Sequence, residues 1–187
     1  MIFSGTIFFG MMFLGMAVLG MSLSTYTTVH VIISLVGIAS GLVVLFGMMA
    51  GKRLDGMTAL FLTTTVLTSV TGFGFPFEKL LPSHILGIIS LCALAICLVA
   101  RYPRQMSGGW RRTYVITATM ALYFNCFVLV VQGFMKVDAL KALAPTQKEP
   151  PFAIAQGILL LAFIVAGIYA AKGFKQDIVL ASNRRAA

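Results

Sequence analysis

The sequence predicts an all-α protein, a polytopic transmembrane helical bundle of five or six spans. Three observations predict it. Of the 187 residues, 59% are hydrophobic and only 10% are charged, whereas soluble domains are roughly a quarter charged. The apolar residues form continuous runs of about 20 residues, the length that an α-helix needs to cross a bilayer. The charged residues gather in short breaks between these runs.

Each expected element is bounded by charged residues, Pro or Gly. Residues 1–20 are apolar throughout and are expected to form a retained N-terminal helix, because a signal peptide usually has a basic start and this segment has none. A cleaved signal and a natural start at Met21 are the alternatives. The bundle is expected over residues 21–174, and residues 175–187 form a basic cytoplasmic tail. The five strong spans are expected at residues 26–50, 57–77, 83–102, 113–136 and 152–173.

The segment VDALKALAPTQKEPP, between the last two spans, is expected to form a short amphipathic turn on the membrane surface. The residues Val137, Leu140, Leu143 and Ala144 fall on one helical face, which suits such a position. Pro145 should end this turn, and Pro150 should start the last span. A simple interfacial loop is preferred over a lid that covers a pocket.

Lys and Arg are unevenly divided between the two sides of the predicted bundle, ten against four. The positive-inside rule places the richer side and the C-terminus in the cytoplasm. The net charge of +9 is therefore explained by membrane orientation, and no nucleic-acid partner is expected. The richer side holds Lys52, Arg53, Arg101, Arg104, Arg111, Arg112, Lys172, Lys175, Arg184 and Arg185, and the other side holds Lys79, Lys136, Lys141 and Lys148.

Polar side chains are expected to gather in the outer half of the membrane. Asn125, Gln132 and Lys136 are seven and four residues apart, so they form one stripe on one helix face. The sequence predicts an outward-opening polar pocket for a ligand. The alternative is that each amide bridges two helices, which contributes about 0.6 kcal/mol per hydrogen bond. The expected pocket residues are His30, His84, Asn125, Gln132 and Gln156.

The two histidines also suggest a cofactor site. His30 and His84 lie near the outer ends of two spans that run in the same direction, so both rings can serve as axial ligands of one b-type haem. A structural role is preferred, in which His30 bonds to a neighbouring helix and His84 lies at the interface. The three cysteines include no CxxC pair and read as packing residues, so neither a disulfide nor a metal site is expected.

Small and hydroxyl-bearing residues predict close helix packing. Gly37 and Gly41 form a GxxxG pair. Thr64, Thr68 and Thr71 share one face of the next span, and their hydroxyl groups can bond to the carbonyl groups of their own helix. A packing face is preferred over a hydrated path.

Four stretches carry a resemblance to known proteins: TTVHVIISLVGI, TSVTGFGFPFEKLLPSH, ALYFNCFVLVVQGFMK and ALAPTQKEPPFAIAQ. They resemble a group of small multi-span inner-membrane proteins of bacteria that has no assigned activity. The resemblance covers roughly residues 21–173. It implies a bacterial inner-membrane location and supports the helix count, but it transfers no catalytic residue.

No hydrolase elbow, phosphate loop, HExxH or metal-binding cysteine motif occurs, so an ordinary enzyme is not expected and no residue is assigned as catalytic. The preferred function is a non-catalytic accessory or structural subunit. Its partners would be the lipid bilayer and other subunits of a larger membrane complex. The alternatives are a b-type haem redox protein and a small transporter or channel. No carboxylate lies within any span, which counts against the transporter.

Overall fold

The computed structural model describes the backbone of residues 20–75 and 82–174, and the side chains of the same residues except 82–84. This part of the chain forms helices and no strand, so the all-α prediction is confirmed for it. The expected N-terminal helix and the basic tail lie outside the described residues. The helices are α2 (Leu23–Met49), α3 (Asp55–Gly72), α4 (Pro82–Arg101), α5 (Trp110–Lys136), α6 (Asp138–Leu143) and α7 (Pro150–Gly173).

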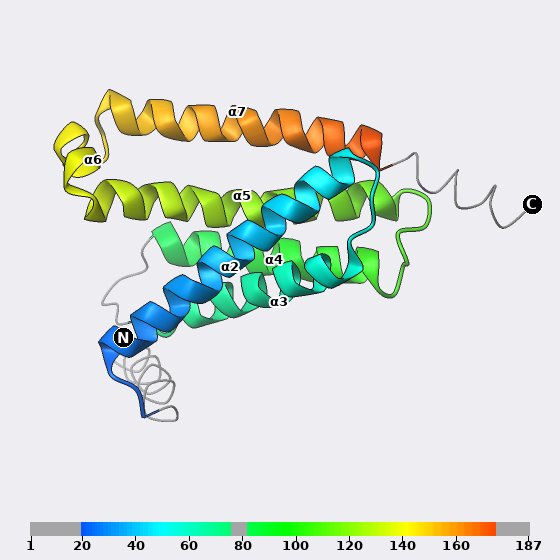
Figure 1. Ribbon diagram of the computed structural model, residues 1–187, viewed down its shortest axis with the longest axis horizontal. Helices are drawn as coiled ribbons and strands as arrows, with labels where there is room; N and C mark the ends of the chain where they lie inside the picture. The colour runs from blue at the N-terminus through cyan, green and yellow to red at the C-terminus, as the bar shows by residue number, and fades with distance from the viewer. Residues whose placement is uncertain (1–19, 76–81, 175–187) are drawn as a thin grey trace, which may run out of the picture.

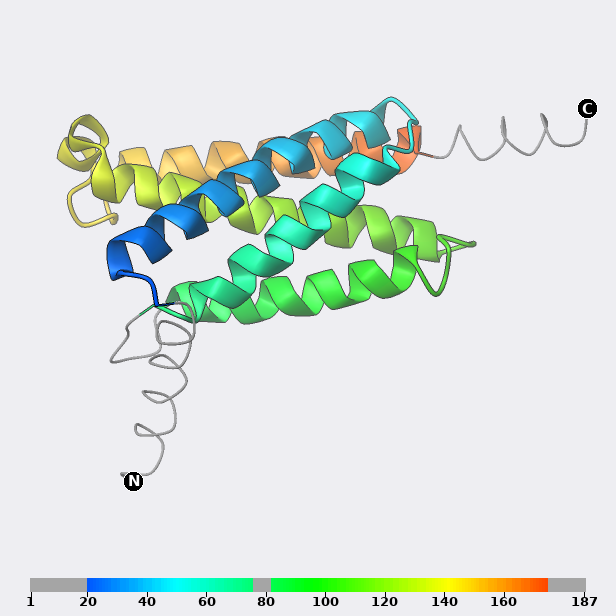
Figure 2. The same ribbon diagram turned by 60° about the horizontal axis from the view of Figure 1, so that its bottom comes forward.

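Five long helices form an elongated bundle (Figure 1). α5 packs against α4 and α7, and α2 packs against α3. α2 crosses the bundle obliquely, so that its C-terminal end meets α7 while its N-terminal end lies far from it (Figures 1 and 2). We call the end that holds the α2–α3 and α4–α5 connections the basic end, and the end that holds α6 the α6 end.

Three helices, α2, α5 and α7, are long and apolar enough to cross a membrane. α3 begins with Asp55 and is rich in threonine, which lowers its hydropathy. In α4, the stretch Ile85–Arg101 qualifies as a shorter apolar helix. Each of the five predicted spans overlaps a helix, although α3 ends at Gly72, before the predicted end of its span, and length and composition support a membrane crossing for three of them.

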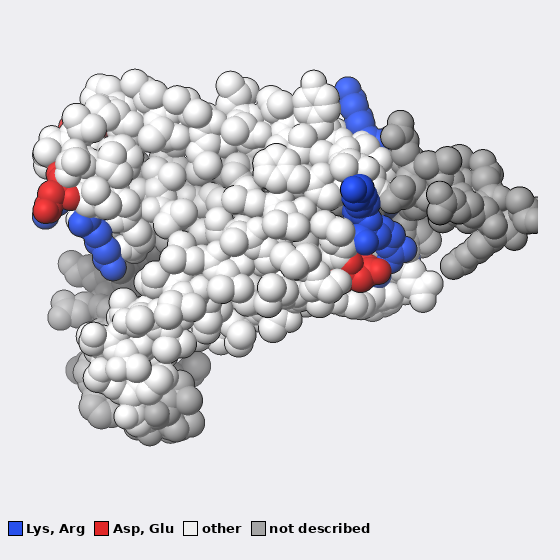
Figure 3. All heavy atoms as spheres, in the orientation of Figure 1, with Lys and Arg blue, Asp and Glu red and all other residues white. Residues whose placement is uncertain are grey.

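The charged side chains of the described residues lie at the two ends of the bundle, and the side wall between them is uncharged on the face that Figure 3 shows. Their division is uneven. The basic end holds Lys52, Arg53, Arg101, Arg104, Arg111, Arg112 and Lys172 with one acid, Asp55, whereas the α6 end holds Lys136, Lys141 and Lys148 with Asp138 and Glu149.

The GxxxG pair packs as predicted. A Cβ atom at Gly41 would lie 2.6 Å from Leu122 Cδ1 and 2.8 Å from ring carbons of Phe61, so α2, α3 and α5 are in tight contact there. A Cβ atom at Gly37 would lie 3.1 Å from Thr64 Oγ1. The Thr64 hydroxyl donates to the Leu60 carbonyl of its own helix at 2.7 Å, which leaves the threonine face free to pack.

An ion pair connects α3 to α4 at the basic end. Arg101, at the end of α4, is 8% exposed and bonds to the Asp55 carboxylate at the start of α3. The Arg101 guanidinium also lies 5.3 Å from the ring centroid of Tyr114, a cation–π contact. From the sequence, Arg101 was counted only among the cations that orient the bundle, because its partner Asp55 is 46 residues away.

The short amphipathic turn predicted between the last two spans is a helix of six residues, α6, but Ala144 of its predicted face is completely buried. The helix ends at Leu143, before Pro145, and Pro150 occupies the first turn of α7, as expected. Val137 and Leu143 are 49% and 57% exposed, so their apolar side chains are available to a membrane surface.

Candidate functional site

A cavity of about 680 Å³ lies between the N-terminal half of α2 and the C-terminal half of α5, with α3 and α4 completing its wall. The crossing angle of α2 explains it. The two helices touch where Gly41 meets Leu122, and they diverge from there toward the α6 end. Ile38 and Phe124 line the cavity near that contact, and Thr27 and Lys136 line it near the helix ends.

Most of the cavity wall is apolar, with polar groups spaced along it. The apolar residues include Val31, Leu35 and Leu129, which are also 41%, 46% and 45% exposed. Because these side chains lie both on the cavity wall and on the outer surface, the cavity opens sideways between α2 and α5. The polar lining residues are Thr27, His30, Ser34, Thr68, Ser69, Ser90, Asn125, Gln132 and Lys136.

Three of the five residues predicted for the pocket, His30, Asn125 and Gln132, line this one cavity, and so does Lys136 from the same stripe. The seven-and-four spacing along α5 predicted the shared face of Asn125, Gln132 and Lys136. Gln156 is not among the lining residues. Its side-chain amide donates to the Phe127 carbonyl at 3.2 Å, so it bridges α7 to α5, the alternative that the sequence left open.

The side chain of His84 lies outside the described residues, as do Glu78 and Lys79. The paired-histidine haem site therefore stays a prediction. Within the described part of the chain, no group of three His, Cys, Asp or Glu side chains is placed to hold a metal ion. Cys97 and Cys126 are buried, Cys92 is exposed, and all three are free thiols.

His30 is held by a specific hydrogen bond to α3. Its Nδ1 lies 2.8 Å from Thr71 Oγ1, and the Thr71 hydroxyl lies 2.7 Å from the Leu67 carbonyl. A threonine hydroxyl has one proton, and the carbonyl can only accept it, so His30 Nδ1 is the donor to Thr71. In a neutral ring, Nε2 is then a hydrogen-bond acceptor.

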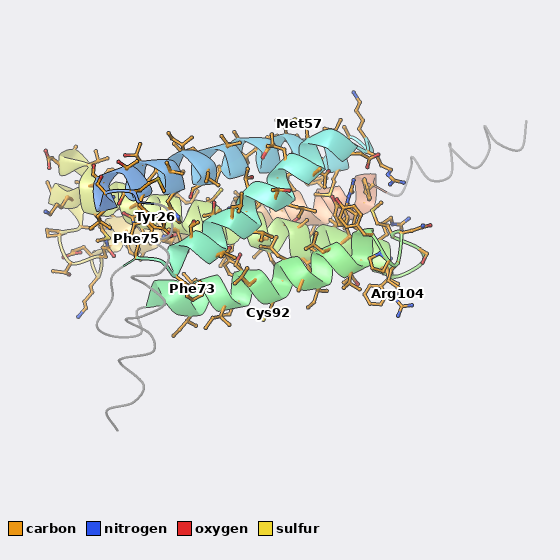
Figure 4. The ribbon with its side chains drawn as sticks, turned by 90° about the horizontal axis from the view of Figure 1, so that it is seen from below. Tyr26, Met57, Phe73, Phe75, Cys92 and Arg104 are labelled. Carbon is orange, nitrogen blue, oxygen red and sulfur yellow. The ribbon has the colours of Figure 1, made fainter. Side chains whose placement is uncertain are left out.

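Aromatic side chains fix the orientation of the His30 ring. Phe75 packs edge-on against it, with ring centroids 5.0 Å apart and an angle of 88°. Tyr26 packs against the same Phe75, as Figure 4 shows, and donates its hydroxyl proton to the Thr71 carbonyl at 2.7 Å. The end of α3 is thereby tied to the start of α2, and His30 is fixed beside the cavity.

Deeper polar groups of the cavity wall connect the helices to one another. The Asn125 amide donates to Thr65 Oγ1 at 3.4 Å, and the Ser69 hydroxyl donates to Ser90 Oγ at 3.3 Å. Thr68 Oγ1 is buried and has no hydrogen-bond partner among the described residues. Ser90 was not predicted as a lining residue, because a single serine in an apolar helix forms no repeating pattern of polar residues.

Lys136 is the one charged side chain among the described residues that line the cavity, and no described acid faces it there. The Lys136 side chain is exposed and makes no ion pair with any described acid. In the described part of the chain, the cavity therefore combines an apolar wall, several neutral hydrogen-bonding groups and one positive charge near the α6 end. Such a site can bind a small molecule that is mostly apolar and has a polar group at one end.

No known protein family matches the chain, and neither a curated protein nor a solved structure is significantly similar to it.

Proposed function

We propose that the protein is a polytopic integral membrane protein in which α2, α3, α4, α5 and α7 all cross the bilayer. At about 1.5 Å per residue, α3 and α4 are about 27 and 30 Å long, close to the thickness of about 30 Å of a hydrocarbon core. The charges of the described residues support one shared orientation. The basic end carries seven cations and one acid, and the α6 end carries three cations and two acids, so the basic end would face the cytoplasm.

The location that goes with this topology is the inner membrane of a bacterium, which rests on the resemblance described above. Reporter fusions after Arg112 and after Gln147 test the topology. We expect the first to report the cytoplasm and the second to report the opposite side. Reports from the same side would overturn the five-span arrangement.

We further propose that the protein acts by binding and not by catalysis, and that it holds a small, mostly apolar ligand in the cavity between α2 and α5. The observation that carries this proposal is the cavity itself. Its volume of about 680 Å³ falls within the range of about 300–1,000 Å³ of small-molecule sites. Its apolar wall and side opening match a ligand that reaches it through the lipid.

Filling the cavity tests the binding function. Ser34→Trp places an indole in the space beside His30 and Leu35, whereas Ile158→Trp places one on the outer face of α7, where Ile158 is 65% exposed. We expect native mass spectrometry to detect at least about tenfold less bound amphiphile on Ser34→Trp than on the wild type. Ile158→Trp should retain it. Equal retention by both variants would refute the cavity as the binding site.

The accessory-subunit hypothesis is the second candidate, and the surface of α7 favours it. In the most apolar stretch of 18 residues of α7, only 6% of the residues are buried within the bundle. Ile154, Ile158 and Leu161 are each at least 59% exposed, so this helix offers an apolar face to lipid or to another subunit. Chemical cross-linking from Leu161→Cys in native membranes, compared with the same protein purified and reconstituted alone, distinguishes a protein neighbour from lipid.

A further inference from the structure

We propose that the cavity selects an anionic amphiphile, with an acidic head group beside Lys136 and an apolar chain along the wall between α2 and α5. The inference rests on the binding function proposed above. It adds the charge of the ligand and the direction in which it lies.

The charge follows from the lining residues. Lys136 supplies a positive charge, and no acid lines the cavity in the described part of the chain. The nearest described acids along the chain form no ion pair with it, and Glu149 instead accepts hydrogen bonds from Thr146 and from the backbone amide of Lys148. Among the described lining residues, a cationic head group would meet only like charge, whereas a carboxylate or phosphate would find a partner at the edge of a low-dielectric site.

The direction follows from the positions of the polar and apolar groups. Lys136 ends α5, and Gln132 lies one turn before it, so the charge is at the membrane surface, where an acidic head group is hydrated. Val31, Leu35 and Leu129 line the deeper wall and are also exposed to the outside of the bundle. A chain that leaves between α2 and α5 at this depth would enter the hydrocarbon layer directly.

A brominated fatty acid and its methyl ester form the matched probe pair. 9,10-Dibromostearate and methyl 9,10-dibromostearate have the same brominated chain, and at pH 9 the carboxyl group of the acid is ionised whereas the methyl ester is neutral. The chain has a single tryptophan, Trp110, so the double variant Trp110→Phe/Phe124→Trp has one fluorophore on the cavity wall. A bromine atom that contacts this tryptophan quenches its fluorescence. The variant Trp110→Phe/Ile158→Trp reports collisions on the lipid-facing side of α7.

In neutral vesicles, we expect the acid to quench the Phe124→Trp reporter at about one tenth of the concentration needed for the ester, a preference that corresponds to about 1.4 kcal/mol. The α7 reporter should show no preference. Lys136→Gln should abolish the preference, and Lys141→Gln, an exposed lysine of α6 that does not line the cavity, should keep it.

Three failures are distinguishable. Equal quenching of the Phe124→Trp reporter by acid and ester, above the α7 background, would refute the anion selectivity and leave the binding function intact. Quenching no stronger than the α7 background by either probe would refute both. Survival of the preference in Lys136→Gln would refute the role of this lysine.

Discussion

The basic end of the bundle is filled, whereas the α6 end is hollow, although the same helices build both. At the crossing point, Gly41 admits Phe61 and Leu122 to contact distance, and at the basic end Tyr114 is 1% exposed beside the buried Arg101. At the α6 end, α2 and α5 diverge and their side chains line a cavity. The difference shows that one crossing point can divide a bundle into a packed region that provides stability and an open region that provides a site.

The largest expected effect is at the crossing point. Gly41→Leu would insert a branched side chain where even a Cβ atom meets Leu122 Cδ1 at 2.6 Å. We expect a loss of at least about 3 kcal/mol in the free energy of unfolding, measured by reversible unfolding in mixed micelles. Gly157→Leu on α7 is the control, because no atom lies within 4 Å of a Cβ there. Similar losses in both variants would mean that α2 and α5 do not meet at Gly41.

The next effect concerns the ion pair at the basic end. Asp55→Asn leaves the Arg101 guanidinium buried without its counter-charge. Because the Asp55 side chain is 67% exposed, we expect about 2 kcal/mol of destabilisation, less than the 3–5 kcal/mol of a fully buried pair. Arg53→Gln is the control, because the Arg53 side chain is 50% exposed and 3.7 Å from the same carboxylate. A loss that is no larger in Asp55→Asn than in this control would refute the structural role of the Arg101 pair.

The cavity wall should tolerate a change that the packed region does not. Gln132→Leu should alter the free energy of unfolding by less than about 0.5 kcal/mol, because Gln132 is exposed and lines open space. Ala121→Leu on the same helix should cost about 2 kcal/mol, because Ala121 is completely buried. The same unfolding measurement compares the two. Equal losses of unfolding free energy in Gln132→Leu and Ala121→Leu would contradict the difference between the open and the packed region.

The smallest effect is in the loop that joins α6 to α7. Desolvation alone would raise the pKa of Glu149, but hydrogen bonds from the Thr146 hydroxyl and from the backbone amides of Thr146 and Lys148 outweigh it, so the pKa lies below its ordinary value of 4.5. A carboxylate with a lowered pKa favours the folded loop above its ordinary pKa, and this contribution is lost as the pH falls through the lowered value. NMR titration should give a low pKa for Glu149, and Thr146→Val should raise it.

The helices could be predicted because apolar runs and their breaks are local signals. α6 was found by the spacing of Val137, Leu140 and Leu143, and the pocket by the spacing of Asn125 and Gln132 on one helix. When several residues of a site lie on one face of the same helix, their spacing in the sequence predicts that they lie together.

Contacts between distant helices could not be predicted in the same way. α7 is apolar around its whole circumference, so its sequence does not show which face meets α5, and Gln156 was assigned to the wrong surroundings. Arg101 and Asp55 lie in separate breaks of the sequence, and only the packing of α3 beside α4 joins them. Helix pairing is decided by the fit of side chains across the interface, which no single segment encodes.

The oblique crossing of α2 also has a mechanical consequence. Gly41 is a fulcrum, and the fourteen residues from there to Thr27 at the cavity mouth form a rigid lever about 21 Å long. A tilt of about 5° at the fulcrum displaces the tip by about 1.8 Å, from the length of such a lever. The width of the mouth thus depends on a small angle at a distant contact, and the hydrogen bonds of Tyr26 and His30 to Thr71 hold that angle.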